Sequence, residues 1–332
     1  MEIHLLGASV LTYNRPSQAI PEMRYRMDAE YDVVIVGGGV AGLSAAIYTT
    51  RAQLKTLIVE QLAPGGQILN TSDIENYPGF PEGVLGPEIG QRIYQQAEAT
   101  GTEFAIDQVI GLKVNGETKV VVGEEREYTT KTIVITTGGE HNKLGVPGED
   151  EFSGRGVTYC ATCDGNFFKG QDTVVVGGGD AAIDEGMYLS RIVNSLTVVH
   201  RRDELRATKV LQERAFNTKN VSFKLSHAVK EIRGNGSVDR VLLEDLKTGD
   251  EFEYPTSGVF IYVGFHPNSA FLQGTVALDP GGHVITGIRM ETDTPGVFAA
   301  GDVRQYSDRQ LGTSVGDGIT AALSAYRYIT EG

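Results

Sequence analysis

The chain has 332 residues, of which 40% are hydrophobic and 22% charged, and its formal net charge is −14. A chain of this length exceeds one ordinary hydrophobic core, so we expect two domains. The acidic balance argues against nucleic acid or an anionic membrane surface as the main partner. No run of about 18 or more apolar residues occurs, so we expect no membrane span.

The N-terminal segment MEIHLLGASVLTYNRPSQAIPEM contains a short apolar patch. Glu2 and His4 precede it, where a signal peptide would carry Lys or Arg. We therefore expect residues 1–30 to be an N-terminal extension, with a start at Met23 or Met27 as an alternative, and the protein to be cytoplasmic. In that reducing compartment a CxxC pair is more often catalytic or metal-binding than a structural disulfide.

The first recognisable unit, residues 31–60, predicts a strand, a helix and a second strand. Apolar β-rich runs at 33–36 and 56–59 flank a glycine turn and an alanine-rich helical segment. The turn carries the GxGxxG residues Gly37, Gly39 and Gly42. Glycines at this spacing bring a helix N-terminus and bare backbone close to a dinucleotide pyrophosphate. Glu60 ends the second strand, where a carboxylate can accept hydrogen bonds from ribose hydroxyls. The unit predicts a site for FAD or NAD.

The same pattern recurs from residue 172. A strand at 173–176 leads into a GxGxxA turn formed by Gly177, Gly179 and Ala182, followed by a helix and a strand ending at Val199. Where the first unit has an acid, the second has the basic group His200, Arg201, Arg202 and Arg206. Guanidinium groups at this place suit a 2′-phosphate, which predicts NADPH. The alternative is a solvated helix start capped by Asp203.

The remaining segments complete the first unit. Residues 102–136 alternate in short apolar runs typical of a β-meander, and 294–303 predicts a strand that leads into Asp302 and a helix starting at Gly316. We expect one domain to be inserted in the other: FAD-binding parts at 31–142 and 269–332, and an NADPH-binding domain at 143–268.

Cys160 and Cys163, the two cysteines of the chain, form a CxxC motif in GVTYCATCDG. A zinc site needs four ligands, and six scattered histidines supply no second pair at ligand spacing, so we expect no metal. A structural disulfide across so short a loop constrains the chain little. We favour a redox-active dithiol, because this spacing allows a disulfide and nearby groups can stabilise one thiolate.

These motifs resemble, over residues 31–330, the low-molecular-weight NADPH-dependent thioredoxin reductases. The resemblance rests on GGGVAGLSAA, PGGQILNTSDIENYPGF, CATCDG, GGGDAAIDEG, HRRDELRA and AAGDVRQYSDRQ, in that order. It implies an α/β fold of two Rossmann-like, three-layer dinucleotide-binding domains, with the NADPH domain inserted in the FAD domain. It also implies a homodimer that reduces thioredoxin.

The resemblance further implies a role for each matching residue. FAD would be held by Gly37, Gly39, Gly42, Glu60, Gly66, Gln67, Asn76, Asp302, Arg309 and Gln310. NADPH would be held by Gly177, Gly179 and Ala182, with His200, Arg201, Arg202 and Arg206 around the 2′-phosphate. Cys160 and Cys163 would be the redox disulfide, with Cys160 attacking thioredoxin and Cys163 facing the flavin.

Asp164 follows the second cysteine directly. The resemblance makes it the proton donor and acceptor for the thiol, and a carboxyl beside a leaving thiolate is in reach to do this. Its alternative role is a helix cap. Because the disulfide and the nicotinamide belong to one inserted domain yet must meet the same flavin, we expect that domain to rotate on a hinge near 138–145 and 265–272.

Three positions depart from the family pattern: Val40 in the first glycine turn, Tyr159 before the first cysteine, and Asp317 in the last segment. We expect Asp317 either to lower the flavin potential or to cap a helix. Two alternatives stay open for function: a ferredoxin-fed or other-donor enzyme of the same fold, and a reductase of another dithiol protein. A non-catalytic redox sensor would need no CxxC beside a flavin.

Overall fold

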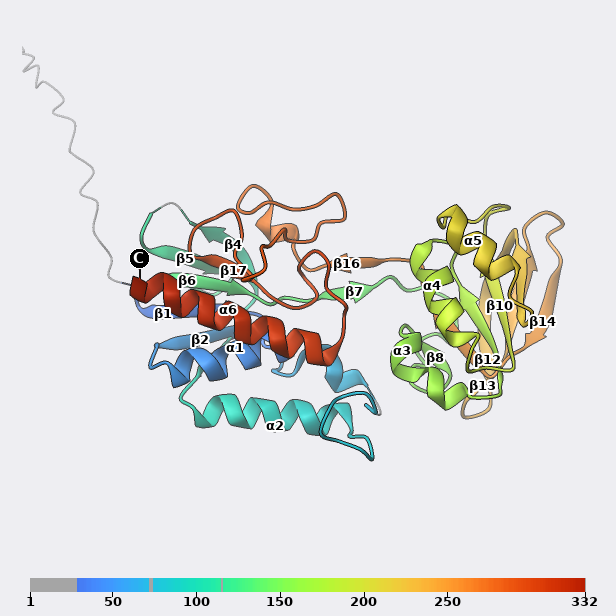
Figure 1. Ribbon diagram of the computed structural model, residues 1–332, viewed down its shortest axis with the longest axis horizontal. Helices are drawn as coiled ribbons and strands as arrows, with labels where there is room; N and C mark the ends of the chain where they lie inside the picture. The colour runs from blue at the N-terminus through green and yellow to red at the C-terminus, as the bar shows by residue number, and fades with distance from the viewer. Residues whose placement is uncertain (1–28, 72–73, 115, 332) are drawn as a thin grey trace, which may run out of the picture.

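A computed structural model of the chain describes residues 29–71, 74–114 and 116–331. Two bodies lie side by side, joined by two extended segments (Figure 1). Residues 1–28, which make up most of the expected N-terminal extension, lie outside the described residues.

The first body is built on a seven-stranded sheet. Its strands are β1 (Tyr31–Val36), β2 (Thr56–Glu60), β3 (Glu103–Ile106), β4 (Val109–Lys113), β5 (Lys119–Gly123), β6 (Glu127–Ile135) and β17 (Val297–Ala299). Strands β3, β2, β1 and β6 are parallel neighbours, and β5 and β4 continue from β6 as the predicted antiparallel meander. The distant β17 adds to β6 in parallel, so the C-terminal part of the chain returns to this sheet.

Alternating strand residues give this sheet two buried faces. Val33 and Ile35 of β1 pack against the helices α1 (Val40–Arg51) and α6 (Leu311–Glu331), with α2 (Gly86–Ala99) beyond α1. Val34 and Val36 point the other way, onto β5 and the loops of the 270–285 segment. The result is a three-layer arrangement around an apolar sheet.

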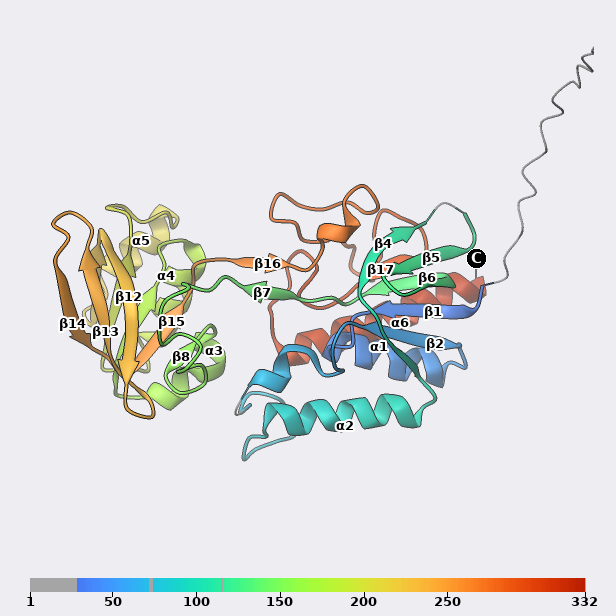
Figure 2. The ribbon, with the colours of Figure 1, turned by 180° about the vertical axis from the view of Figure 1, so that it is seen from behind.

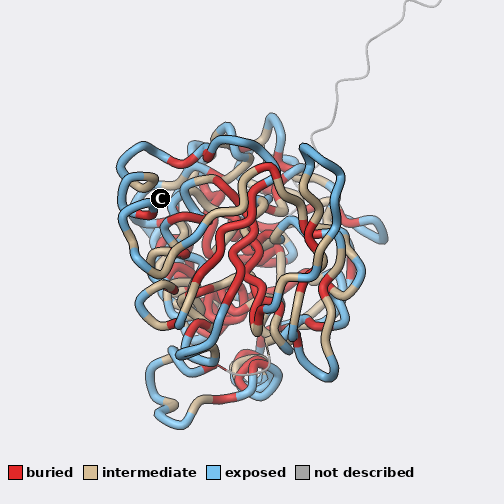
Figure 3. The backbone as a smooth tube through the Cα atoms, turned by 90° about the vertical axis from the view of Figure 1, so that its right-hand side faces the viewer, coloured by how far each residue is buried: buried red, intermediate tan, exposed pale blue. Residues whose placement is uncertain are grey.

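The second body holds a five-stranded, all-parallel sheet in the order β11-β10-β9-β15-β8. These strands are β8 (Val157–Thr158), β9 (Asp172–Val176), β10 (Ser195–His200), β11 (Val221–Leu225) and β15 (Gly258–Ile261). One face carries α3 (Ala161–Asp164), α4 (Asp180–Leu189) and α5 (Lys209–Phe216). The other face carries a three-stranded sheet, β12 (His227–Gly234), β13 (Val238–Asp245) and β14 (Glu251–Pro255). Figure 3 shows the buried strands running through the middle of the molecule.

The two bodies are joined by a pair of short antiparallel strands, β7 (Gly139–His141) and β16 (Phe265–Pro267). Both cross the gap between the bodies, as the view from behind shows (Figure 2). They fall inside the segments predicted to form a hinge. The second body therefore lies within the first in chain order, and the prediction of one nucleotide-binding fold inserted in another is confirmed.

Three local predictions need correction. The last helix begins at Leu311 and not at Gly316, because Gly312 and Gly316 are accommodated inside the helix. Strand β10 runs on to His200, one residue past Val199. Asp203 starts no helix: α5 begins at Lys209, so the alternative of a capped helix start at HRRDELR is wrong.

Candidate functional site

The first glycine turn lies at the carboxyl end of β1, as predicted. Gly37 has a φ of 102°, and a Cβ there would sit 2.6 Å from the Thr136 carbonyl oxygen. A Cβ on Gly42 would sit 2.1 Å from the Gly37 oxygen, so packing of the turn onto α1 also requires glycine. Gly39 differs, because its Cβ would meet only the Gly66 Cα, at 3.9 Å. The open side at Gly39 fits a ligand phosphate that approaches the backbone.

Glu60 stands at the end of β2 beside this turn. Its carboxylate accepts the Gly38 amide at 2.6 Å and the Leu62 amide at 3.1 Å. These two bonds fix the direction of the carboxylate at the place where a ribose would lie.

Three elements far apart in sequence converge at the edge of the first body. The Gly66 loop touches Gly39, the Gln67 amide donates to the Gly139 carbonyl of β7, and the Asn76 amide donates to Gln310 Oε1 at 3.2 Å. Of the residues predicted for the flavin ring, the structure thus gathers Gly66, Gln67, Asn76 and Gln310 around the start of α6 and the first connecting strand.

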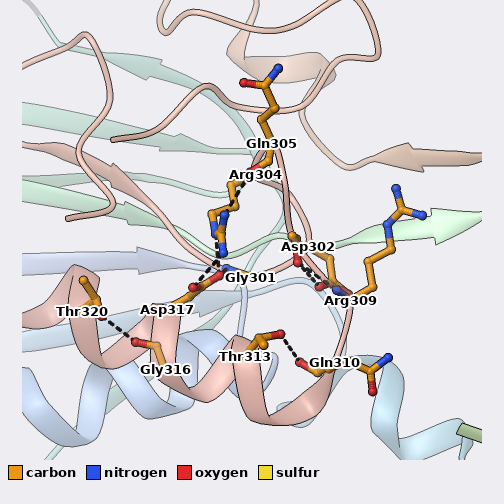
Figure 4. Close-up of polar contacts among 11 residues, drawn as sticks. Gly301, Asp302, Arg304, Gln305, Arg309, Gln310, Thr313, Gly316, Asp317 and Thr320 are labelled. Carbon is orange, nitrogen blue, oxygen red and sulfur yellow. Dashed lines mark hydrogen bonds and ion pairs between the residues drawn. The ribbon is translucent and has the colours of Figure 1, made fainter. Parts of the chain in front are cut away.

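Asp302 and Arg309 lie at the same edge (Figure 4). Asp302 accepts the Ser307 hydroxyl at 2.9 Å, and burial raises the pKa of its carboxyl above the usual range. A partly buried carboxyl that accepts hydrogen bonds from serine hydroxyls has further lone pairs for a ligand hydroxyl. The Arg309 guanidinium lies 4.0 Å from the centre of the Phe265 ring of β16. Arg309 therefore contacts a connecting strand.

The second glycine turn repeats the first with one difference. Gly177 packs against Ala182, whose Cβ would lie 2.8 Å from a Cβ on that glycine, while a Cβ on Gly179 would meet nothing within 4 Å. Gly179 thus leaves the same open approach to backbone that Gly39 does. His200 lies beneath the turn: it is 6% exposed, and burial, with help from Arg206, lowers its pKa. Its imidazole packs against Gly178 of the turn.

The three arginines predicted to bind the 2′-phosphate lie at the surface. Arg201, Arg202 and Arg206 are exposed. Within residues 29–71, 74–114 and 116–331 none of their guanidinium groups makes a hydrogen bond or ion pair. The Arg206 backbone amide donates to the Gly178 carbonyl at 2.6 Å, which ties this group to the glycine turn. Three free guanidinium groups beside a dinucleotide turn fit a 2′-phosphate.

Cys160 and Cys163 form a disulfide, with their Cα atoms 5.3 Å apart. The pair spans the first turn of α3, and the Cys163 amide donates to the Cys160 sulfur at 3.2 Å. Although this turn belongs to the second body, it faces the first: the Gln310 amide donates to Thr162 Oγ1 at 3.3 Å. The disulfide therefore lies at the boundary between the two bodies, beside the predicted flavin residues.

Asp164 follows Cys163 directly and is the last residue of α3. Its carboxylate accepts the Thr158 hydroxyl, and burial raises its pKa above that of an exposed aspartate, partly offset by that hydrogen bond. Its side chain makes no N-capping hydrogen bond at the start of the short 3-10 helix Gly165–Phe168 that follows. The geometry thus provides a partly buried carboxyl next to the sulfurs that holds its proton to higher pH than usual.

Two further residues of the inserted domain, Tyr262 and Glu185, were not predicted from the sequence. The Ala161 amide, at the first residue of α3, donates to Tyr262 Oη at 2.6 Å, and Tyr262 donates to Glu185 Oε2 at 3.4 Å. Burial raises the pKa values of Glu185 and Tyr262. Glu185 stands inside the quoted GGGDAAIDEG motif, but nothing in the sequence indicates that it meets Tyr262.

Tyr159, one of the departures from the family pattern, contacts the connecting strand β7. Its hydroxyl donates to Glu149 Oε1 at 2.8 Å, and its ring stacks on His141 of β7 at 5.3 Å. Burial, with the Arg309 charge, lowers the pKa of His141 to about 4. The residue before the disulfide is thus in contact with the predicted hinge.

Asp317, another departure, makes an ion pair within the first body (Figure 4). Its carboxylate accepts Arg304 Nε at 2.5 Å and Nη2 at 3.0 Å, and it also accepts the Gly301 amide at 3.2 Å. It therefore ties α6 to the end of β17 and caps no helix.

We expect Asp317→Asn to lower the free energy of unfolding by about 3 kcal/mol, because it leaves the largely buried Arg304 charge without its counter-charge. Urea unfolding of the flavin-loaded protein measures this. The exposed Asp308→Asn on the same segment is the control and should change stability little. Equal unfolding midpoints for the two variants would contradict the structural role.

Comparison with known proteins places this geometry in a family. Residues 31–324 match the pyridine nucleotide-disulphide oxidoreductase family. A thioredoxin reductase of Bacillus subtilis (strain 168) is 49% identical over 302 residues, which are 91% of this chain and 95% of that protein. A thioredoxin reductase structure from Streptococcus pyogenes is 46% identical, covers 91% of this chain and 99% of that chain, and superposes with a TM-score of 0.88. The chain belongs to the pyridine nucleotide-disulphide oxidoreductase family, among its low-molecular-weight thioredoxin reductases.

A second solved relative superposes less closely. The Lactococcus lactis thioredoxin reductase in its FR conformation is 45% identical and covers 91% of this chain and 100% of that chain, yet its TM-score is 0.62. Among the described residues, no helix is long and apolar enough to cross a membrane.

Proposed function

We propose that the chain is an NADPH-dependent thioredoxin-disulfide reductase that holds FAD in residues 31–142 and 269–332 and NADPH in residues 143–268. The observation that carries this is the Cys160–Cys163 disulfide, presented by the inserted nucleotide domain to Gln310 and Asn76 of the other domain. We further propose a cytoplasmic homodimer whose partner is thioredoxin, with no nucleic acid or membrane involved.

The residues present fit both dinucleotides. The open backbone at Gly39 and the oriented Glu60 suit the FAD pyrophosphate and ribose, and the partly buried Asp302 suits the ribityl chain. Gly179 and the free Arg201, Arg202 and Arg206 suit NADPH. When bound, the flavin supplies two-electron chemistry between the nicotinamide and the disulfide.

Residues of this chain then carry out the reduction of the disulfide and its exchange with thioredoxin. Two electrons and one proton break the bond between the Cys160 and Cys163 sulfurs and leave one thiol and one thiolate. Asp164, next to Cys163 in the chain, supplies the proton that makes Cys163 the thiol, and Cys160 remains the thiolate. Cys160 then attacks the thioredoxin disulfide, and Cys163 displaces it from the mixed disulfide. For this exchange the dithiol must leave the domain boundary, and β7 and β16 form the narrow connection on which the inserted domain turns.

The test is anaerobic reduction of the purified yellow protein. NADPH should remove the flavin absorption rapidly and NADH much more slowly, and thioredoxin should then be turned over. A yellow protein that neither nucleotide reduces would overturn the NADPH assignment and point to ferredoxin or another one-electron donor. Rapid reduction without thioredoxin turnover would point to a different dithiol protein as substrate.

We expect Asp164→Asn to slow thioredoxin reduction by about 10²-fold, because general acid catalysis is lost. The wild-type rate should fall as pH rises through the raised pKa of the Asp164 carboxyl, since only its protonated form donates. Asparagine does not titrate, so this fall should be absent from the variant. The measurement is kcat with thioredoxin as a function of pH. A variant that keeps both the wild-type rate and the alkaline fall would rule out the acid role.

A further inference from the structure

The Thr162 hydroxyl, between the two cysteines, lies on a line of hydrogen bonds that crosses the domain boundary. Asn76 Nδ2 is 3.2 Å from Gln310 Oε1, Gln310 Nε2 is 3.3 Å from Thr162 Oγ1, and Thr162 Oγ1 is 3.4 Å from the Cys160 sulfur. Asn76 and Gln310 belong to the FAD-binding part, and Thr162 and Cys160 belong to the inserted domain.

The chemistry of the amides gives this line a direction. Asn76 donates to the Gln310 oxygen, which leaves the Gln310 NH₂ group to face Thr162. An amide NH₂ only donates, so the Thr162 oxygen accepts from it. The one hydrogen of the Thr162 hydroxyl is then free to point to the Cys160 sulfur.

We propose that Thr162 is a catalytic residue that donates a hydrogen bond to the Cys160 sulfur, and that Gln310 and Asn76 are positioning residues that aim it. This rests on the proposed function. When the disulfide takes up two electrons and one proton, the S–S bond breaks, Cys163 becomes a thiol and Cys160 a thiolate. The Thr162 hydroxyl, together with the Cys163 amide at 3.2 Å, stabilises that negative charge.

The same line makes the stabilisation depend on domain arrangement. Gln310 reaches Thr162 only while the disulfide faces the FAD-binding part. Once the inserted domain turns away, the hydroxyl is no longer aimed and the Cys160 thiolate becomes more basic. A more basic thiolate is intrinsically more nucleophilic. Cys160 is thus a good leaving group beside the flavin and a better attacking group when it meets its protein substrate.

The test uses flavin-loaded protein carrying Cys163→Ala, so that Cys160 is its single thiol. The rate of iodoacetamide alkylation is followed by mass spectrometry as a function of pH, and its midpoint reports the pKa of the Cys160 thiol. Adding Thr162→Val, which keeps the shape and removes the hydroxyl, should raise the midpoint by about one pH unit, a tenfold loss of thiolate at fixed pH. Thr162→Ser should restore it. Equal midpoints for threonine and valine would overturn the proposal.

Gln310→Leu in the same background tests whether the hydrogen bond from Gln310 across the domain boundary affects the pKa of the Cys160 thiol. It should raise the midpoint in the same direction as Thr162→Val, whereas Gln273→Leu, an exposed glutamine of the same domain, should leave it unchanged. If Thr162→Val shifts the midpoint and Gln310→Leu does not, control by domain arrangement is overturned. Flavin absorption checks that each variant keeps its cofactor. Alkylation needs no turnover, so failure of the proposed function appears separately, as wild-type protein that does not reduce thioredoxin.

Discussion

Cys160→Ser is expected to lower thioredoxin reduction by roughly 10³-fold or more, in line with removal of the nucleophile in other enzymes. A serine oxygen can neither form the disulfide nor attack one, so electrons stop at the flavin. The residues that fit FAD and NADPH are untouched, and NADPH should still remove the flavin absorption. Stopped-flow absorbance and a thioredoxin turnover assay together measure the two steps.

The matched variant is Cys163→Ser. With a thioredoxin that carries one activated cysteine, Cys163→Ser should form a stable mixed disulfide through Cys160, and Cys160→Ser should form none. The reverse result would exchange the roles of the two cysteines. Trapping by both variants would mean that neither sulfur is reserved for the protein substrate.

Alanine at Arg201, Arg202 or Arg206 is expected to lower kcat/KM for NADPH by about tenfold to a hundredfold each, with little change for NADH. A hydrogen bond to a charged group contributes about 1.5–3 kcal/mol, which corresponds to that range. The three guanidinium groups are exposed beside the second glycine turn, and the described residues offer them no hydrogen bond or ion pair. The three guanidinium groups are therefore available to bind the 2′-phosphate of NADPH.

The measurement is the ratio of kcat/KM for NADPH to that for NADH. Arg191→Ala, at an exposed arginine just beyond α4, is the control for loss of positive charge in the same domain. If all three variants keep the wild-type ratio, the second nucleotide site does not read the 2′-phosphate. A fall for Arg191→Ala as large as for the others would mean that general attraction, and no specific contact, is responsible.

Much of the fold could be predicted from the sequence because both nucleotide units are encoded locally. The strands at 33–36 and 173–176 were placed to within two residues at their starts and to the residue at their ends. Each is an apolar run that stops at a glycine turn, and both signals lie within ten residues. The helix α6 was placed five residues late, because its first turns contain Gly312 and Gly316, which lower helix propensity. Burial of its apolar face on α1 outweighs that local preference.

Parts of the site could not be predicted. Tyr262 lies 101 residues from Ala161, and Gln310 lies 148 residues from Thr162. No periodicity or spacing rule links residues so far apart, and the Gln310 contact depends on how the inserted domain is turned. The ion pair of Asp317 with Arg304 could not be predicted either, because it depends on how α6 packs against the end of β17.

The sequence by itself determined the groups available for chemistry. It contains two glycine turns typical of dinucleotide sites, the first followed by an acidic residue and the second by a basic group, and a dithiol motif between them. These are short-range patterns whose residue types and spacing the ligands require. Only the tertiary structure decided which groups surround the dithiol, because the Cys160–Cys163 turn meets Gln310 and Tyr262 through packing of separate elements and through one arrangement of two domains on a two-stranded connection.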